Sequence, residues 1–168
     1  MHDISKDHLH NQIGKTPELS RVEMTELVLP NDTNLLGNLL GGRLMHWIDI
    51  AGAMAASRHS NMIVATVALD SLDFRHPARM GELVILKAKL TWTGRTSMEV
   101  GVSCYAENIK SGSVILTNQA YVTFVALDKD GKPTPVPPLV LETDEEKRIF
   151  QEAEERRAER LKRKDLRM

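Results

Sequence analysis

The sequence predicts one α+β domain, in which a long central helix is wrapped by a curved antiparallel sheet of about five strands, with a further helix at the C-terminus. A proline-free run rich in Ala, Leu and Met is long enough for the central helix. Five runs of β-type residues lie on either side of it, and hairpin-length links between the later runs favour antiparallel neighbours. A chain of 168 residues suits a single domain with a substantial core.

The N-terminal elements are an arm, a strand and the central helix. Residues 1–20 are polar and aperiodic, which predicts a flexible arm. Residues 21–29 alternate and stop at Pro30, which predicts a strand. After a stretch of turn formers, residues 43–59 form the helix, and apolar side chains cover nearly all of its sides. Such a helix is expected to be buried on every side by the sheet.

Four further strands complete the predicted body over residues 21–141, and short turns separate most of them. A proline-rich segment then ends the sheet. The charged C-terminal helix over residues 142–168 begins at Thr143, with Glu146 placed for a capping box. We expect it to be mostly solvated; the alternative is a basic tail that binds a partner. The predicted strands are residues 62–70, 82–92, 97–106 and 114–127.

Composition excludes several classes of protein and site. The net charge of −1 lacks the basic excess of a general nucleic-acid binder. Cys104 is the only cysteine, which rules out an intramolecular disulfide and a multi-cysteine zinc site, and we expect it to be a small buried hydrophobe. Charged residues interrupt every apolar stretch, so we expect no membrane insertion. No secretory signal is visible, and a cytoplasmic location is expected.

Asp49 is unusual because it lies in the middle of the predicted buried helix. An isolated buried carboxylate is costly unless it finds partners or its pKa rises. Small residues one and two turns away, including Gly52 and Ala53, leave room for a ligand or for another backbone. Two interpretations stay open at this point: a carboxylate tied to backbone amides for structure, or one used for chemistry.

The segment before the helix offers donors for a negative charge. Gly41 and Gly42 precede the helix, where free backbone N–H groups and the helix dipole can stabilise an oxyanion. The alternative is a flexible turn. Asn34 can supply a neutral amide donor, or it can form a local Asx turn.

Taken together, these residues resemble the signature of acyl-CoA thioesterases of the hotdog superfamily, of the cytosolic acyl-CoA hydrolase type. The resemblance extends over about residues 20 to 165, and the strand–helix–four-strand order is the hotdog order. The residues that carry it are Pro30, Asn34, Gly37, Gly41, Gly42, Asp49, Ala53, His59, Thr66, Leu72 to Phe74, Pro77, Gly94 to Val100, Phe124 to Asp128, Gly131 to Pro133, Val136 and Pro137.

The resemblance implies hydrolysis of an acyl-CoA thioester to CoASH and a free acid, without a metal or a separate cofactor, because coenzyme A is part of the substrate. It implies that Asp49 is the catalytic carboxylate, acting as general base or as nucleophile. Asn34 is implied as its partner at the thioester, and Thr66 as the residue that orients water or Asp49. The carbonyl oxygen would be held by backbone N–H groups around Gly41 and Gly42.

The resemblance also implies an assembly. Two protomers are expected to join their sheets edge to edge as a homodimer, with Asn34 of one chain meeting Asp49 of the other. A trimer of such dimers, a hexamer, is the expected larger assembly. The helix-end His59 is expected to be a cap stabilised by the helix dipole, and His46 has no Ser or Cys nucleophile at a recognisable spacing.

Coenzyme A contacts are expected at a turn and at scattered arginines. The turn with Arg95, Thr96 and Ser97 resembles the loop near the pantetheine and phosphates, and Arg95 can bind a phosphate, although an ordinary β-turn arginine is an equal reading. Arg75 and Arg79, which flank Pro77, are further and weaker phosphate candidates.

Two other functions are compatible with a hotdog fold. A non-catalytic acyl-CoA sensor would keep the fold, but such a sensor normally adds a DNA-binding domain. We expect none here, because residues 1–20 are too short for one and the C-terminal helix is too solvated. A hotdog enoyl-CoA hydratase would use a His with a carboxylate, whereas this helix carries Asp49 in the thioesterase position.

Overall fold

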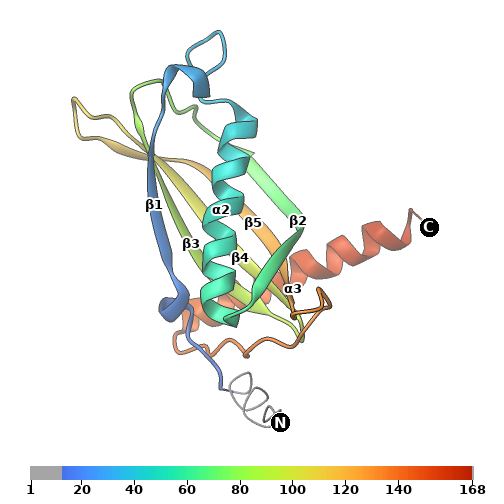
Figure 1. Ribbon diagram of the computed structural model, residues 1–168. Coiled ribbons are helices and arrows are strands. Elements are labelled where there is room, and N and C mark those ends of the chain that lie inside the picture. The colour runs from blue at the N-terminus through green and yellow to red at the C-terminus, as the bar shows by residue number, and fades with distance from the viewer. Residues whose placement is uncertain (1–12, 168) are drawn as a thin grey trace.

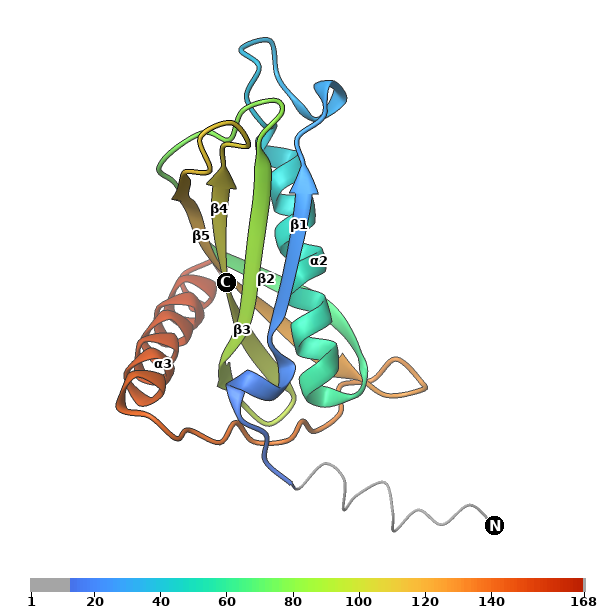
Figure 2. The ribbon, with the colours of Figure 1, turned by 90° about the vertical axis from the view of Figure 1, so that its left-hand side faces the viewer.

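The computed structural model describes residues 13–167 and has three layers, with one helix on each face of a single sheet (Figure 1). Figure 2 shows the sheet edge-on, with α2 on one side and α3 on the other. The elements, in chain order, are η1 (Pro17–Ser20), β1 (Val22–Leu27), η2 (Pro30–Asp32), α2 (Gly41–Ser60), β2 (Ile63–Phe74), β3 (Leu83–Thr93), β4 (Ser97–Glu107), β5 (Val114–Leu127) and α3 (Asp144–Asp165).

The five strands form an antiparallel sheet in the order β1-β3-β4-β5-β2. Short hairpin links make β3, β4 and β5 neighbours, as predicted. β2 is joined to β3 by a longer link, and it pairs instead with β5 and forms the far edge. Residues 75–82 carry the chain past β5 and β4 to β3, a crossing of about 14 Å at the usual strand spacing, which a link of this length spans easily.

One side of α2 packs on the sheet and supplies the centre of the core. Its buried residues include Leu44, Ile48, Ala51 and Ala55, whose spacing of three and four residues forms one helical face. Gly52 is small because a Cβ there would lie 3.0 Å from the Phe124 ring. The structural interpretation of the small residues therefore holds for Gly52.

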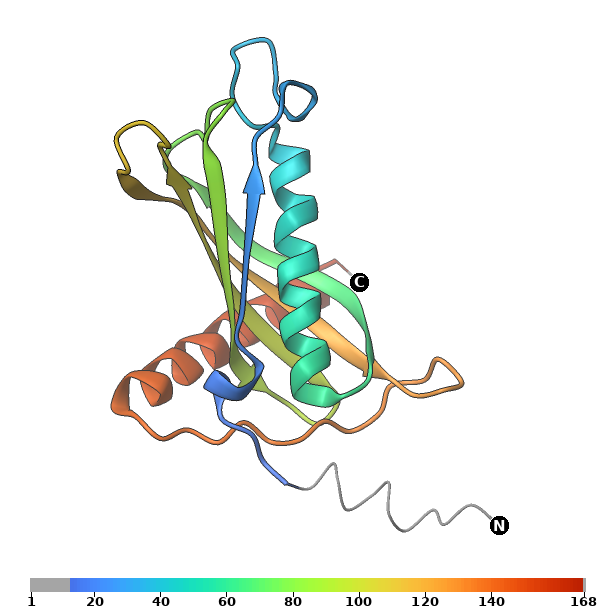
Figure 3. The ribbon, with the colours of Figure 1, turned by 60° about the vertical axis from the view of Figure 1, so that its left-hand side comes forward.

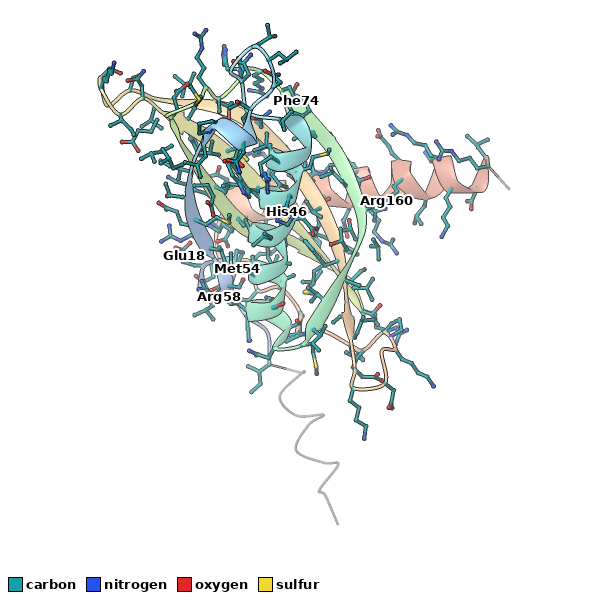
Figure 4. All side chains as sticks on the ribbon, turned by 45° about the horizontal axis from the view of Figure 1, so that its top comes forward. Glu18, His46, Met54, Arg58, Phe74 and Arg160 are labelled. Carbon is teal, nitrogen blue, oxygen red and sulfur yellow. The ribbon has the colours of Figure 1, made fainter. Side chains whose placement is uncertain are left out.

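The expectation that α2 is buried on every side is wrong for the single chain. Met45, Ile50 and Met54 are exposed on the side away from the sheet. Figure 4 shows Met54 and His46 on this outer side. The sheet is curved but open, as Figure 3 shows, so it covers only one side of the helix. An exposed apolar stripe of this kind on a helix is typical of a surface that another molecule covers.

β2 runs four residues beyond its predicted end because it is bulged. The register with β5 shifts between Thr66 and Ala68 and again between Asp70 and Leu72. Ser71 takes a positive φ of 44°, which lets the strand absorb an extra residue and continue to Phe74. Bulges on an edge strand re-aim the side chains next to them, and Thr66 is one of these.

α3 begins with the predicted capping box, in which Thr143 accepts from the Glu146 N–H and the Glu146 side chain accepts from the Thr143 N–H. The helix is largely exposed, as expected, and Ala153 is its only buried residue among those described. One side is nevertheless anchored to the sheet. Arg156 donates two hydrogen bonds to the buried Glu99, at 2.8 and 3.2 Å.

The expectation of a free arm over residues 1–20 is wrong for residues 13–20, which pack on the body; residues 1–12 lie outside the described residues. The backbone of Lys15 hydrogen-bonds to Pro138 and Val140. Its ammonium group donates to the Arg58 carbonyl and, at 2.5 Å, to Asn61, and so covers the C-terminal end of α2. Within residues 13–167, no helix combines the length and apolarity needed to cross a membrane.

Candidate active site

The structure brings Asp49 and Thr66 together. Asp49 lies halfway along α2, and β2 runs beside this helix on its return path. The Thr66 hydroxyl donates a 2.6 Å hydrogen bond to Oδ1 of Asp49. A charge-assisted bond of this length fixes the carboxylate rotamer, and it leaves Oδ2 without a hydrogen-bond partner among residues 13–167. Asp49 is half-buried and not fully buried as expected, because the outer side of α2 is open.

The N-terminal end of α2 is open toward solvent. The residue before the helix, Leu40, has no side chain that caps it. A Cβ added to Gly42 would meet nothing within 4 Å, and one added to Gly41 would touch only the ring of Phe74, at 3.7 Å. Figure 4 shows Phe74 beside this end of the helix. Uncapped N–H groups with space in front of them are suited to bind an anionic oxygen.

Asn34 lies on a projecting loop at the same end of the molecule. Its Oδ1 accepts from the N–H groups of Leu36 and Asn38, at 2.9 and 3.2 Å, so the predicted Asx turn is present. Gly37, with a φ of 75°, completes the turn. The amide NH₂ of Asn34 has no partner among the described residues. Asp49 lies about 12 Å further along the helix axis than Gly41, and no hydrogen bond joins it to Asn34 within the described chain.

An ion pair that sequence reasoning missed holds this loop to the helix. Asp32 is buried, and its carboxylate accepts from Arg43 at 3.0 Å and from the Leu29 N–H at 3.0 Å. The bond from the Leu29 N–H to Asp32 spans only three residues and belongs to a local capping arrangement. An Asp three positions after Leu29 could therefore have indicated this part of the contact from the sequence.

The candidate contacts for coenzyme A lie at opposite ends of the sheet. Arg95, Thr96 and Ser97 form the turn between β3 and β4, while Arg75 follows the end of β2. β3 alone separates the two ends by about 35 Å. One chain therefore cannot place Arg75 and the Arg95 turn on the same phosphate.

Each of these arginines also has a local environment. The Arg95 side chain is exposed, and its carbonyl accepts from the Val136 N–H. Arg75 donates to Asp73 at 3.0 Å, and both side chains are exposed. Arg79 is exposed near the Asn34 loop, where it forms a β-bridge with Asn38.

His59 has a different role from the one expected. It is fully buried, and its Nε2 lies 2.7 Å from the Pro137 carbonyl. Burial lowers the pKa of His59 below its ordinary value, with the nearby Lys15 acting in the same direction and the bond to Pro137 opposing them. A neutral imidazole does not stabilise the helix dipole. His59 instead ties the end of α2 to the proline-rich segment, and its buried Nδ1 has no hydrogen-bond partner in the described part of the chain.

Cys104 is fully buried on β4, as predicted, and burial raises the pKa of its thiol to about 12. It is therefore an inert part of the core. Within residues 13–167, no three His, Cys, Asp or Glu side chains lie close enough to hold a metal ion.

Residues 36–113 match the family model of the thioesterase superfamily. The chain is 41% identical to an acyl-CoA thioester hydrolase of Bacillus subtilis, over 89% of this chain and 90% of that protein. It is 33% identical to the cytosolic acyl coenzyme A thioester hydrolase of Rattus norvegicus over 87% of this chain, but this covers only 39% of the rat protein.

Solved structures agree with these sequence matches. A hexameric acyl-CoA thioesterase without ligand superimposes with a TM-score of 0.86 at 42% identity, covering 90% of this chain and 97% of that one. The acyl-CoA hydrolase of Staphylococcus aureus in complex with butyryl coenzyme A, coenzyme A and coenzyme A disulfide has a TM-score of 0.83 at 35% identity, covering 89% of this chain and 92% of that one.

Three further structures of the Staphylococcus aureus enzyme carry single alanine substitutions of an asparagine, an aspartate and a threonine. Their spacing along that chain, fifteen and then seventeen positions, is the spacing of Asn34, Asp49 and Thr66 here. The strand order, the Asp49–Thr66 pair and identities above 40% agree with one another. This chain belongs to the acyl-CoA thioesterases of the hotdog superfamily.

Proposed function

We propose that this protein hydrolyses the thioester of acyl-CoA to CoASH and a free carboxylic acid, and that Asp49 performs the reaction. The observation that carries the proposal is the Asp49–Thr66 hydrogen bond, on a helix whose N-terminus is open. It supplies a fixed carboxylate, and the helix N-terminus about 12 Å away supplies backbone donors. These are the two groups that acyl transfer to water needs, and a second protomer has to bring them together.

The chemistry has two courses that use the same carboxylate. As a general base, Asp49 takes a proton from a water molecule that attacks the carbonyl carbon, and the tetrahedral intermediate then expels the CoA thiolate. As a nucleophile, Asp49 attacks that carbon itself, the thiolate leaves, and water hydrolyses the resulting anhydride. In both courses Thr66 orients the carboxylate, and the N–H groups at the Gly41–Gly42 end of the second protomer's helix hold the developing oxyanion.

We propose that the site is completed across a homodimer. β2 is an edge strand with exposed apolar residues, among them Ile63 at 76% and Val67 at 56% exposure. Together with the exposed stripe on α2, it offers an apolar surface of the kind that obligate dimers bury. Edge-to-edge pairing of two β2 strands would place the Asn34 loop of one protomer toward Asp49 of the other.

Pairing about a two-fold axis also suits the contacts proposed for coenzyme A. Antiparallel pairing would set the Arg75 end of one sheet beside the Arg95–Ser97 end of the next. The two groups of arginine candidates are far apart in one chain, and in the dimer they would lie at the same end of the joined sheet. A hexamer built from three dimers is proposed because the similar structure is described as hexameric. A cytoplasmic location is proposed from the cytosolic relative.

The test is a CoASH-release assay with a thiol reagent, run with acyl-CoAs from acetyl to palmitoyl. We expect wild type to release CoASH from at least one chain length. Asp49→Ala should lose nearly all of this release while keeping its circular dichroism spectrum, and the exposed acid variant Asp130→Asn should retain it. Binding of acyl-CoA without release by wild type would indicate the sensor instead and would refute the proposal.

A further inference from the structure

α3 is longer than the sheet beneath it. The helix crosses the sheet from β3, where Phe150 lies against Trp92, to the edge strand β2, where Arg160 pairs with Asp70. The helix then continues, and residues 161–167, which we call the overhang, extend beyond the edge of β2 (Figure 1). At 1.5 Å per residue the overhang projects about 10 Å, which is the width of two strands.

A cavity of about 500 Å³ lies between the overhang and the free edge of β2. β2 contributes residues 68–71 to its lining, and the rest comes from α3 and from Arg167 just after it. Because β2 pairs with β5 on its other side, no strand of residues 13–167 pairs with its outer backbone N–H and C=O groups, on the side where the cavity opens. A strand added to β2 would pass through this space.

The overhang carries uncompensated positive charge. Lys164 in α3 and Arg167, two residues past its end, are four and seven residues after Arg160, and all three line the cavity beside β2. Arg160 finds Asp70 and Thr123 there, but Lys164 and Arg167 have no carboxylate partner among residues 13–167. Arg163 has only a long, exposed contact with Glu159, at 3.9 Å.

The same face of β2 carries negative charge. Asp70 is opposite Tyr121 and Asp73 is opposite Gln119 in the register with β5. Tyr121 and Gln119 hydrogen-bond to each other and Tyr121 stacks under Arg156, so all four residues lie on the α3 side of the sheet. β2 therefore shows two carboxylates on the side that an overhang would cover; within the chain Asp70 is paired with Arg160 and Asp73 with the exposed Arg75.

We propose that the overhang clasps the β2 strand of a second copy of this chain. In this arrangement the partner's β2 pairs with β2 and fills the cavity, and Lys164 and Arg167 lie over Asp70 of the partner subunit and Asp73 of the partner subunit. Two-fold symmetry makes the contact twice per dimer. The inference rests on the edge-to-edge dimer proposed above and adds to it an electrostatic clasp outside the active site.

Charge reversal tests the clasp. The double variant Lys164→Glu/Arg167→Glu is compared with Lys129→Glu/Lys132→Glu, which makes the same charge change in an exposed turn. Sedimentation velocity over a dilution series gives the Kd for dissociation of the dimer to monomers. In 50 mM salt this Kd should be at least tenfold higher for the clasp variant than for wild type. In 500 mM salt the difference between the two Kd values should be smaller, because salt screens the charges. The control should match wild type. A clasp variant within twofold of wild type in both salts overturns the proposal.

CoASH release by the clasp variant, measured at a concentration where it is dimeric, should equal wild type. If the proposed thioesterase activity is wrong, wild type itself releases no CoASH. If only the clasp is wrong, wild type is active and the clasp variant dimerises like wild type, so the two results are distinguishable.

Cross-linking tests the placement directly. Chains with Ala68→Cys and Arg167→Cys, each with a different affinity tag, are co-expressed and treated with a short bismaleimide at pH 7. The native Cys104 is buried with a pKa of about 12 and does not compete. We expect a covalent dimer of the two chains, and none when Lys129→Cys replaces Arg167→Cys. Assemblies that carry both tags but yield no cross-link, or the absence of such assemblies, would overturn the clasp.

Discussion

The substitution Thr66→Val tests whether Thr66 positions the catalytic carboxylate. Valine keeps the shape of threonine and removes only the hydroxyl that donates the 2.6 Å bond to Asp49. A hydrogen bond to a charged group contributes about 1.5–3 kcal/mol. Thr66 is exposed in the single chain, so the lower part of this range applies. Since about 1.4 kcal/mol corresponds to tenfold in rate, kcat should fall about 10- to 30-fold.

The assay is steady-state CoASH release over a range of acyl-CoA concentrations. KM should change less than kcat because the hydroxyl orients Asp49 and does not bind the acyl chain. Thr66→Ser keeps the donor and should recover most of the lost kcat. In urea, Thr66→Val should lower the free energy of unfolding by no more than about 2 kcal/mol, the contribution of this bond, and Thr66→Ser should lower it less. A valine variant whose kcat stays within twofold of wild type refutes the positioning role.

Three further predictions concern stability. Arg156→Ala leaves the buried Glu99 carboxylate without its ion pair and should lower the free energy of unfolding by about 3 kcal/mol, whereas the exposed Arg148→Ala should cost about 0.5 kcal/mol or less in urea titrations. Because burial lowers the pKa of His59 below 6.5, the unfolded chain binds more protons than the folded one, so stability should fall as pH drops below about 6.5, by at most about 1.4 kcal/mol per pH unit; His59→Gln should flatten this slope. Gly94→Ala places a Cβ 2.6 Å from the Trp92 ring and should lower Tm with a cost of about 1–3 kcal/mol.

Local sequence patterns predicted most of the secondary structure. The β5 run from Val114 to Leu127 matches its strand, and the capping box at Thr143 marks the start of α3 within one residue. These features depend on neighbours in the chain, so the residues themselves carry the information. The Asp49–Thr66 pair was expected from the family resemblance, since nothing in the spacing alone brings a helix residue against a strand residue seventeen positions later.

Long-range pairings were not predictable in the same way. β2 pairs with β5, a strand far along the chain, and no local pattern in β2 specifies that partner. α3 looked solvated because an apolar count cannot detect anchoring by charge, as in the buried Arg156–Glu99 pair. The exposed side of α2 looked buried because the sequence pattern is the same for apolar side chains that pack on the sheet and for those that are exposed in the single chain.

The measurement that most directly tests the central claim is the rate of CoASH release by wild type and by Asp49→Asn at saturating acyl-CoA. The asparagine keeps the size of the side chain and an acceptor for Thr66, but it can neither take a proton nor attack the thioester as a carboxylate. We predict release by wild type and a kcat lowered about 100- to 10,000-fold in the variant, with acyl-CoA binding retained. A variant that turns over at close to the wild-type rate would contradict the assignment of the chemistry to Asp49.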